Sequence, residues 1–125
     1  MVVESNLHGG KGIVRGDQFS IRRTVTGIPV GLTISASTLT LKSAIAASAL
    51  FSKAITSSNV AGTGQIESTG SNGVGKLRFD ILDDDTLLMT ADTEYFYDIQ
   101  ITLSNSDIYT LESGKTSAIA QVTTA

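Results

Sequence analysis

The stretch that decides the fold is Tyr95-Phe96-Tyr97-Asp98-Ile99-Gln100-Ile101-Thr102-Leu103. Its odd positions are Tyr, Tyr, Ile, Ile and Leu, whereas its even positions are mostly polar. This period of two is typical of an antiparallel strand with one buried face. Residues 76–81 alternate in the same way on the other side of an acidic turn. A sheet face without a cluster of polar side chains favours a protein that acts by presenting a surface.

Further β-rich runs predict the remaining strands. We expect them at 18–25, 32–41, 53–57, 64–68, 107–113 and 115–123. The apolar parity changes within the second of these runs, which predicts a bulge near Ser37. The run Asp83-Asp84-Asp85 predicts one short helical turn near 83–90, because aspartate favours the first positions of a helix. For residues 44–51 the sequence does not decide between a helical turn and a loop, since their alanines favour a helix but the segment is short.

Composition indicates one all-β domain. A chain of 125 residues can bury a single core, and its 12 glycines and single proline suit a fold with many turns. About seven to nine short strands imply two packed sheets, because one flat sheet would leave an apolar face in water. We therefore predict an antiparallel β-sandwich over residues 16–125. Residues 1–15, with Gly9-Gly10-Lys11-Gly12, are predicted to form a flexible N-terminal arm.

Charge and cysteine content exclude several classes of partner. A net charge of −3 and scattered basic residues argue against nucleic acid, which requires a basic surface. The absence of cysteine removes disulfides, thiolate zinc sites and thiol nucleophiles. No run of residues is long and apolar enough for a bilayer, and the N-terminus lacks the pattern of a secretory signal. We expect a soluble, unexported chain with neither nucleic-acid nor membrane partners.

Each motif that suggests chemistry has a simpler structural interpretation. The glycine-rich segment 9–12 lacks the Gly-Lys-Ser/Thr ending of a phosphate loop. The acids at 83–85 lack the alternate spacing and distal Glu of a calcium loop. His8 is the one histidine and lies beside glycines, so no Ser-His-acid triad is expected. Arg15-Gly16-Asp17 matches the tripeptide that integrins read, and we interpret it as a chance occurrence. No enzyme activity, metal or cofactor is expected.

Asp98 leaves two interpretations open. It lies opposite the Tyr/Ile face of its strand, where it can be a solvated acid on the sheet surface. Alternatively, it can pin a corner of the fold by accepting a turn N–H or pairing with Arg22, Arg23 or Arg78.

Four motifs occur in an order that carries a resemblance. They are Gly16-Asp17-Gln18-Phe19, Asp83-Asp84-Asp85-Thr86-Leu87-Leu88, Tyr97-Asp98-Ile99-Gln100 and Tyr109-Thr110-Leu111-Glu112-Ser113-Gly114. Together they resemble small tailed-phage virion proteins, in particular the immunoglobulin-like N-terminal module of phage baseplate upper proteins. The resemblance runs from Gly16 onward, with residues 44–75 unmatched. It implies an immunoglobulin-like sandwich with a structural role in the particle, and it supplies no catalytic residues.

The resulting functional hypothesis is a virion structural protein, made in the host bacterial cytoplasm. A capsid decoration or cement protein is the first expectation, with the major capsid protein or another virion protein as partner and homo-oligomer or lattice contacts. The alternatives are a neck, tail or baseplate component, and a module that binds carbohydrate or a host surface, which the aromatic residues near 95–97 and Tyr109 suggest. The expected partner contacts are Val2, Val3, Leu7, His8, Lys11, Ile13, Val14 and Phe96.

Overall fold

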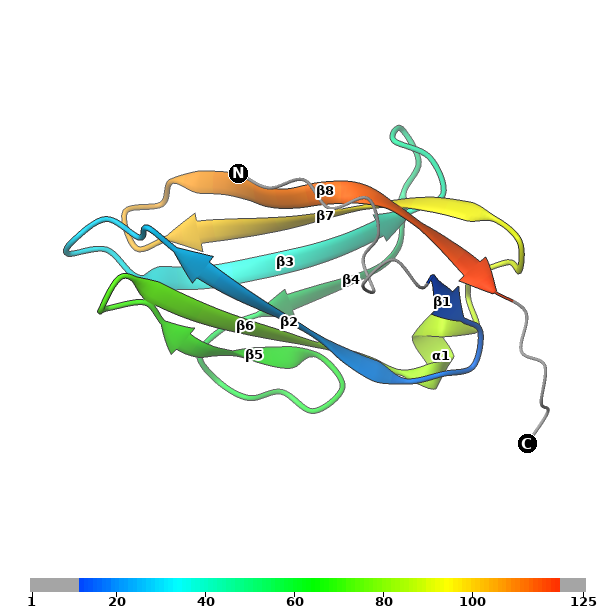
Figure 1. Ribbon diagram of the computed structural model, residues 1–125, viewed down its shortest axis with the longest axis horizontal. Helices are drawn as coiled ribbons and strands as arrows, with labels where there is room; N and C mark the ends of the chain where they lie inside the picture. Colours follow the sequence, from blue (N-terminus) through cyan, green and yellow to red (C-terminus); the bar gives the residue numbers. More distant parts are fainter. Residues whose placement is uncertain (1–11, 120–125) are drawn as a thin grey trace.

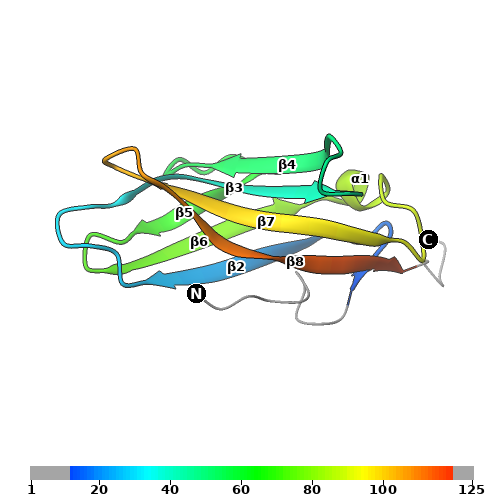
Figure 2. The same cartoon turned by 90° about the horizontal axis from the view of Figure 1, so that it is seen from above.

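Two β-sheets pack face to face in this computed structural model, which describes residues 12–119. One sheet has the order β1 (Ile13–Val14), β8 (Ile108–Ile119), β7 (Glu94–Leu103), β3 (Ile34–Lys42) and β4 (Ala49–Ile55). The other has the order β2 (Phe19–Thr26), β6 (Val74–Ile81) and β5 (Gly64–Thr69). Figures 1 and 2 show the two layers from perpendicular directions. The predicted all-β sandwich is confirmed.

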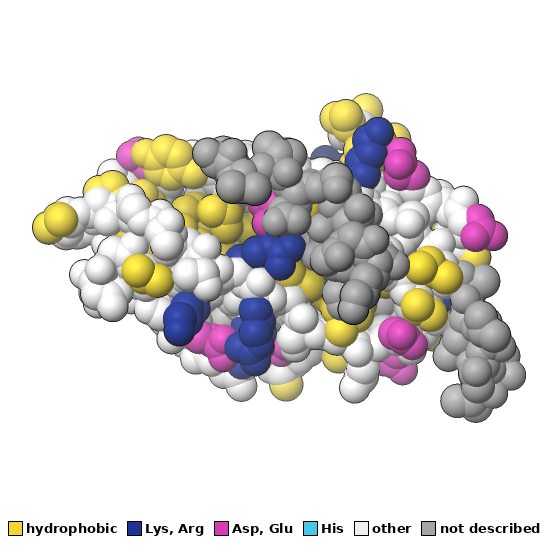
Figure 3. All heavy atoms as spheres, viewed as in Figure 1, with side chains coloured by type: hydrophobic (Ala, Val, Ile, Leu, Met, Phe, Trp, Pro, Cys, Tyr) yellow, Lys and Arg dark blue, Asp and Glu magenta, His cyan; other side chains and the backbone are white. Residues whose placement is uncertain are grey.

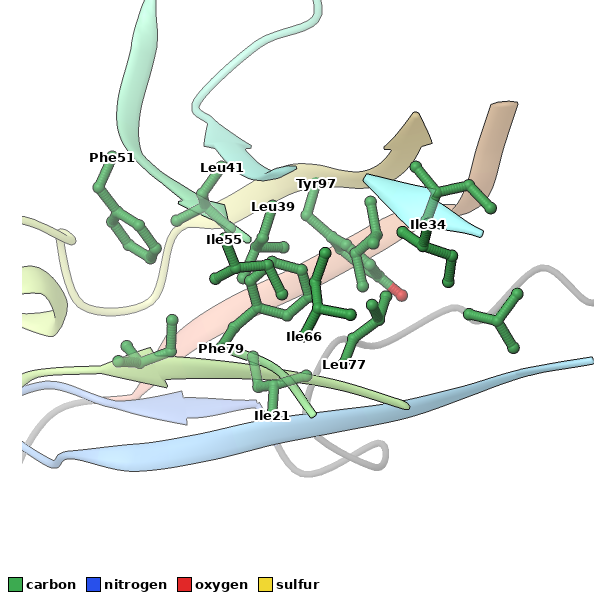
Figure 4. Packing of buried hydrophobic residues seen from close by; sticks show 14 of the residues in the cluster. Ile21, Ile34, Leu39, Leu41, Phe51, Ile55, Ile66, Leu77, Phe79 and Tyr97 are labelled. Atoms are coloured by element: carbon green, nitrogen blue, oxygen red, sulfur yellow. The ribbon is translucent and has the colours of Figure 1, made fainter. Parts of the chain in front are cut away.

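The core fills the space between the two sheets. Every odd position from Tyr95 to Leu103 is buried, as the alternation predicted. The facing strand β6 contributes Leu77, Phe79 and Ile81. Figure 4 shows Leu77, Phe79 and Tyr97 among the side chains that meet between the layers. Complete burial of a side chain such as that of Phe79 contributes about 1.5–3 kcal/mol, so the period-two faces hold the sheets together.

Strand β8 is longer than the sequence predicts. The two strands expected at 107–113 and 115–123 are one strand through residue 119, so the predicted break is wrong. Gly114 pairs with Tyr97 in the ladder with β7, and this pairing outweighs the weak strand preference of glycine. The irregularity lies instead at Leu111, because Thr110 pairs with Gln100 whereas Glu112 pairs with Ile99. Residues 120–123 lie outside the described residues.

Strand β3 contains the predicted bulge slightly earlier than expected. Its register against β7 shifts between Ile34 and Ala36, whereas the prediction was Ser37. Ser37 is buried, and its hydroxyl donates to the Gln100 carbonyl at 2.7 Å. The polar side chain is therefore satisfied within the ladder.

The alanine-rich segment is a turn followed by a strand. The Ala47 N–H donates to the Ala44 carbonyl at 3.0 Å, and β4 begins at Ala49. The loop alternative is therefore the one that the structure adopts, and the strand expected at 53–57 starts four residues earlier. Phe51 explains the early start, because it pairs with Leu41 of β3 and is buried.

The acidic turn forms α1 (Asp83–Thr86), within the predicted range. The Asp85 carboxylate accepts the Leu82 N–H at 2.9 Å and lies 2.6 Å from the Lys53 ammonium group. Lys53 also donates to the Gly62 carbonyl at 2.8 Å, so this buried ammonium group is compensated. Asp85 therefore caps the helical turn and ties it to β4.

The folded part begins earlier than the predicted arm allows. Residues 1–15 were expected to form the arm, yet β1 pairs in parallel with Ala118 and Ile119 of β8. Ile13 is fully buried. Residues 12–15 therefore belong to the sandwich, and residues 1–11 lie outside the described residues.

Candidate functional site

Strand β8 presents an open edge. On one side it pairs with β7 along most of its length, and on the other β1 covers only its last two residues. Within residues 12–119, no strand pairs with the outer side of residues 108–117. A long strand edge is a template onto which an extended chain can add.

Backbone groups on this edge point alternately toward and away from β7. The Ala118 N–H donates to Thr93 at 3.0 Å, and the Ala118 carbonyl accepts from Asp92 at 2.9 Å. Because strand residues alternate in direction, Ser117, Lys115 and Ser113 direct their backbone groups outward. Lys115 and Ser113 lie beyond the residues that β1 covers. They offer donors and acceptors to a further strand.

A groove lies beside this edge, between β8 and β2. Its volume is about 750 Å³. The apolar part of its lining comes from Val25, Ile28, Pro29, Ile101, Leu103, Tyr109 and Leu111. Figure 3 shows hydrophobic side chains at the surface near the end of the molecule where β8 begins. Ile108 is 64% exposed and Tyr109 is 51% exposed there. The open edge of β8 and the neighbouring groove together form a surface that can bury apolar side chains and form hydrogen bonds with a partner.

A buried ionic network lies at one end of the groove. Arg23 of β2 binds Glu112 of β8 with two hydrogen bonds, Nε to Oε1 at 2.7 Å and Nη2 to Oε2 at 3.1 Å. The Tyr97 hydroxyl donates to the same carboxylate at 2.6 Å. Glu112 is only 4% exposed. The network joins the two sheets along their open side and gives the groove a rigid polar wall.

Sequence reasoning missed this network. Strict alternation through residues 107–113 places Glu112 on the face opposite Leu111, away from the core. The irregularity at Leu111 reverses the parity and turns Glu112 inward.

Asp98 forms no side-chain hydrogen bond or ion pair among the described residues, which favours the solvated-acid interpretation. Arg22 and Arg78 instead bind Glu67, and Arg78 also binds Asp80.

The Arg15-Gly16-Asp17 tripeptide holds α1 in place. Arg15 donates through Nε to the Met89 carbonyl at 2.6 Å. The Gly16 N–H donates to Thr86 Oγ1 at 2.9 Å, and that hydroxyl donates to the Asp17 carbonyl at 2.8 Å. Two of the motifs that carry the phage resemblance therefore contact each other.

Phe96 lies half-buried on the outer face of the five-stranded sheet. The Lys115 ammonium group is 5.5 Å from the centre of its ring, within range of a cation–π interaction. A shallow hollow of about 350 Å³ adjoins it and is lined in part by Thr40, Lys42 and Ile45. This surface is separate from the groove at β2 and β8.

The other predicted contact residues divide into two groups. Ile13 is in the core, so its side chain is not available to a partner in this conformation, whereas Val14 is half-buried. The remainder lie outside the described residues: Val2, Val3, Leu7, His8 and Lys11. The structure thus brings none of the described predicted residues into the groove. Tyr95 and Tyr97 are buried, which leaves Tyr109 as the exposed tyrosine of the predicted aromatic set.

Residues 12–119 contain no group of three or more His, Asp or Glu side chains placed to hold a metal ion. No helix in that range has the length and apolar character needed to cross a membrane. No model of a known protein family matches this chain, and no curated protein matches it.

Proposed function

We propose that this protein is a non-enzymatic structural protein of a tailed-phage virion, in the first place a decoration or cement protein of the capsid. The open edge of β8 beside an apolar groove is the observation that carries an attachment role. The order of the four sequence motifs supports the virion setting.

Attachment would combine strand pairing with apolar burial. A segment of the major capsid protein, or of another virion protein, would add to β8 and place apolar side chains over the groove. Covering Ile108 and Tyr109 would contribute about 1–2 kcal/mol each, since both are about half to two-thirds exposed. Contacts between copies, through the arm and the surface around Phe96, would add to this. Many modest contacts, repeated over a shell, stabilise the particle without a cofactor.

The first test is the copy number of the chain in purified particles from its source. Quantitative mass spectrometry would compare it with the most abundant shell protein. A lattice-scale ratio is expected for a decoration protein. A ratio lower by about two orders of magnitude would place the protein in the neck, tail or baseplate, because those parts are low-copy rings. Absence from particles would overturn the virion proposal and favour a module that binds carbohydrate or a host surface.

The second test concerns the attachment surface. Ile108→Asp places a charge at the open edge, whereas Val60→Asp places one on an exposed side chain of the β4–β5 connection. Particles lacking the protein would be incubated with each purified variant, and bound protein would be quantified. We expect Ile108→Asp to lower occupancy at least tenfold and Val60→Asp to bind as the unaltered protein does. Equal occupancy of both variants would exclude the β8 edge as the contact.

A further inference from the structure

The turn between β5 and β6 holds an asparagine that is followed by a glycine. Its residues are Gly70-Ser71-Asn72-Gly73, and the Gly73 N–H donates to the Gly70 carbonyl at 2.8 Å. The Asn72 side chain folds back on the backbone, since its Oδ1 accepts the Val74 N–H at 3.1 Å. That hydrogen bond spans Gly73, so it holds the Cγ of Asn72 close to the Gly73 nitrogen. Asn72 is exposed, so water reaches its amide group.

The turn between β7 and β8 repeats this arrangement with a serine after the asparagine. The Ser106 N–H donates to the Leu103 carbonyl at 2.9 Å, and Asn105 Oδ1 accepts the Asp107 N–H at 3.1 Å. The residue after the asparagine has a left-handed φ in both turns, 91° at Gly73 and 73° at Ser106. The main difference at this position is the side chain of Ser106, which Gly73 lacks. The second turn is therefore an internal reference for the chemistry of the first.

An asparagine that precedes glycine can lose its side-chain amide without an enzyme. The Gly73 nitrogen attacks Cγ of Asn72, and the new N–Cγ bond closes a five-membered succinimide ring. The Cγ–Nδ2 bond breaks, and Nδ2 leaves as ammonia with the proton that the Gly73 nitrogen gives up. Water then opens the ring at one of its two carbonyl groups, which produces aspartate or isoaspartate. Glycine has no Cβ to obstruct ring closure, whereas the serine side chain does obstruct it.

This turn packs against a residue that lines the groove. The Gly73 carbonyl accepts the Ile28 N–H at 3.3 Å, and the two connections lie at the same end of the molecule (Figure 1). Ile28 is buried, and a Cβ added to Gly70 would lie 2.1 Å from its Cδ1 atom. Isoaspartate carries the backbone through Cβ and Cγ, so it adds one carbon atom before Gly73 and displaces the carbonyl that Ile28 uses. Aspartate leaves the backbone unchanged.

We propose that Asn72 is a site of spontaneous deamidation, and that its isoaspartate product releases the Ile28 N–H from the β5–β6 turn. Both turns hold the attacking nitrogen in a hydrogen bond, so the reaction proceeds when a turn opens locally, without global unfolding. Each modified chain gains one negative charge beyond its net charge of −3. The inference goes beyond the proposed function: older copies of the protein differ from new ones beside the groove, whatever partner the groove binds.

Ageing of the full chain tests the deamidation step. The protein would be kept at mildly alkaline pH in water enriched in heavy oxygen, and peptide mapping by mass spectrometry would give the labelled acid fraction at each asparagine. We expect Asn72 to convert at least tenfold faster than Asn105. The exchange variant Gly73→Ser/Ser106→Gly should reverse this order, and a Cβ at residue 73 has open space around it. An Asn72 amide that lasts as long as that of Asn105 would overturn the proposal.

Amide hydrogen exchange tests the effect on Ile28. Ion-exchange chromatography would separate the isoaspartate form of the aged protein from the unaltered form. We expect the Ile28 amide to exchange at least tenfold faster in the isoaspartate form. The control Asn72→Asp carries the same charge on a normal backbone and should change that exchange less than twofold. Equal Ile28 exchange in the isoaspartate and unaltered forms would overturn the proposed release. Both experiments use the free protein, so their failure is separate from failure to find the chain in particles.

Discussion

The Arg23–Glu112–Tyr97 network makes a quantitative prediction about stability. Replacing Arg23 with Met removes both hydrogen bonds to a carboxylate that is 4% exposed. Breaking a buried ion pair by removing one partner costs about 3–5 kcal/mol, because the remaining charge is buried without compensation. The Arg23 side chain is 23% exposed, and Tyr97 still donates to Glu112. We therefore expect Arg23→Met to lower the free energy of unfolding by about 3 kcal/mol, the lower end of that range.

The double variant Arg23→Met/Glu112→Leu should be more stable than the single variant. Both charges are then absent, and no carboxylate remains buried alone. Replacement of a buried ion pair by apolar side chains is often neutral, so we expect the double variant to lie within about 1.5 kcal/mol of the unaltered protein. Urea unfolding followed by circular dichroism would give the midpoint and slope for each variant.

A matched control is provided by the exposed pair of Arg22 and Glu67. Arg22 is the neighbouring residue on β2, its side chain is 63% exposed, and its Nη1 lies 2.5 Å from Glu67. Exposed ion pairs contribute about 0–1 kcal/mol, so Arg22→Met should have little effect. The reasoning is refuted if Arg23→Met costs no more than Arg22→Met, or if Arg23→Met/Glu112→Leu is less stable than Arg23→Met.

Two further substitutions test local contacts. Gly64→Ala should lower the free energy of unfolding by about 2–4 kcal/mol, because φ is +131° and the added Cβ would lie 2.0 Å from the Arg78 carbonyl oxygen. Gly73→Ala, with φ at +91° and open space around the added atom, should cost only about 1 kcal/mol in the same urea titration. Thr86→Val should cost about 1–3 kcal/mol, because it leaves the Gly16 N–H without its acceptor. A thermal midpoint unchanged by Thr86→Val would show that the contact between the two motifs does not stabilise the fold.

Local sequence determined the strands and their buried faces. The pleat has a period of two, so the alternation in residues 95–103 specifies both a strand and the side chains that enter the core. The three aspartates before Thr86 likewise specify a helical turn through interactions within a few residues. The four residues after Leu103 form the connection to β8, and all four are Ser, Asn or Asp, residue types that favour turns.

Tertiary structure alone decided where β8 continues, which acid faces Arg23 and which edge stays open. Gly114 remains in a strand because β7 pairs with it, and the irregularity at Leu111 turns Glu112 toward an arginine 89 residues away in the chain. The parallel pairing of β1 with the end of β8 also joins distant segments. Such contacts depend on how two sheets stack and in which register strands pair. No local residue pattern records this, because the energy of each contact belongs to two segments that meet only after folding.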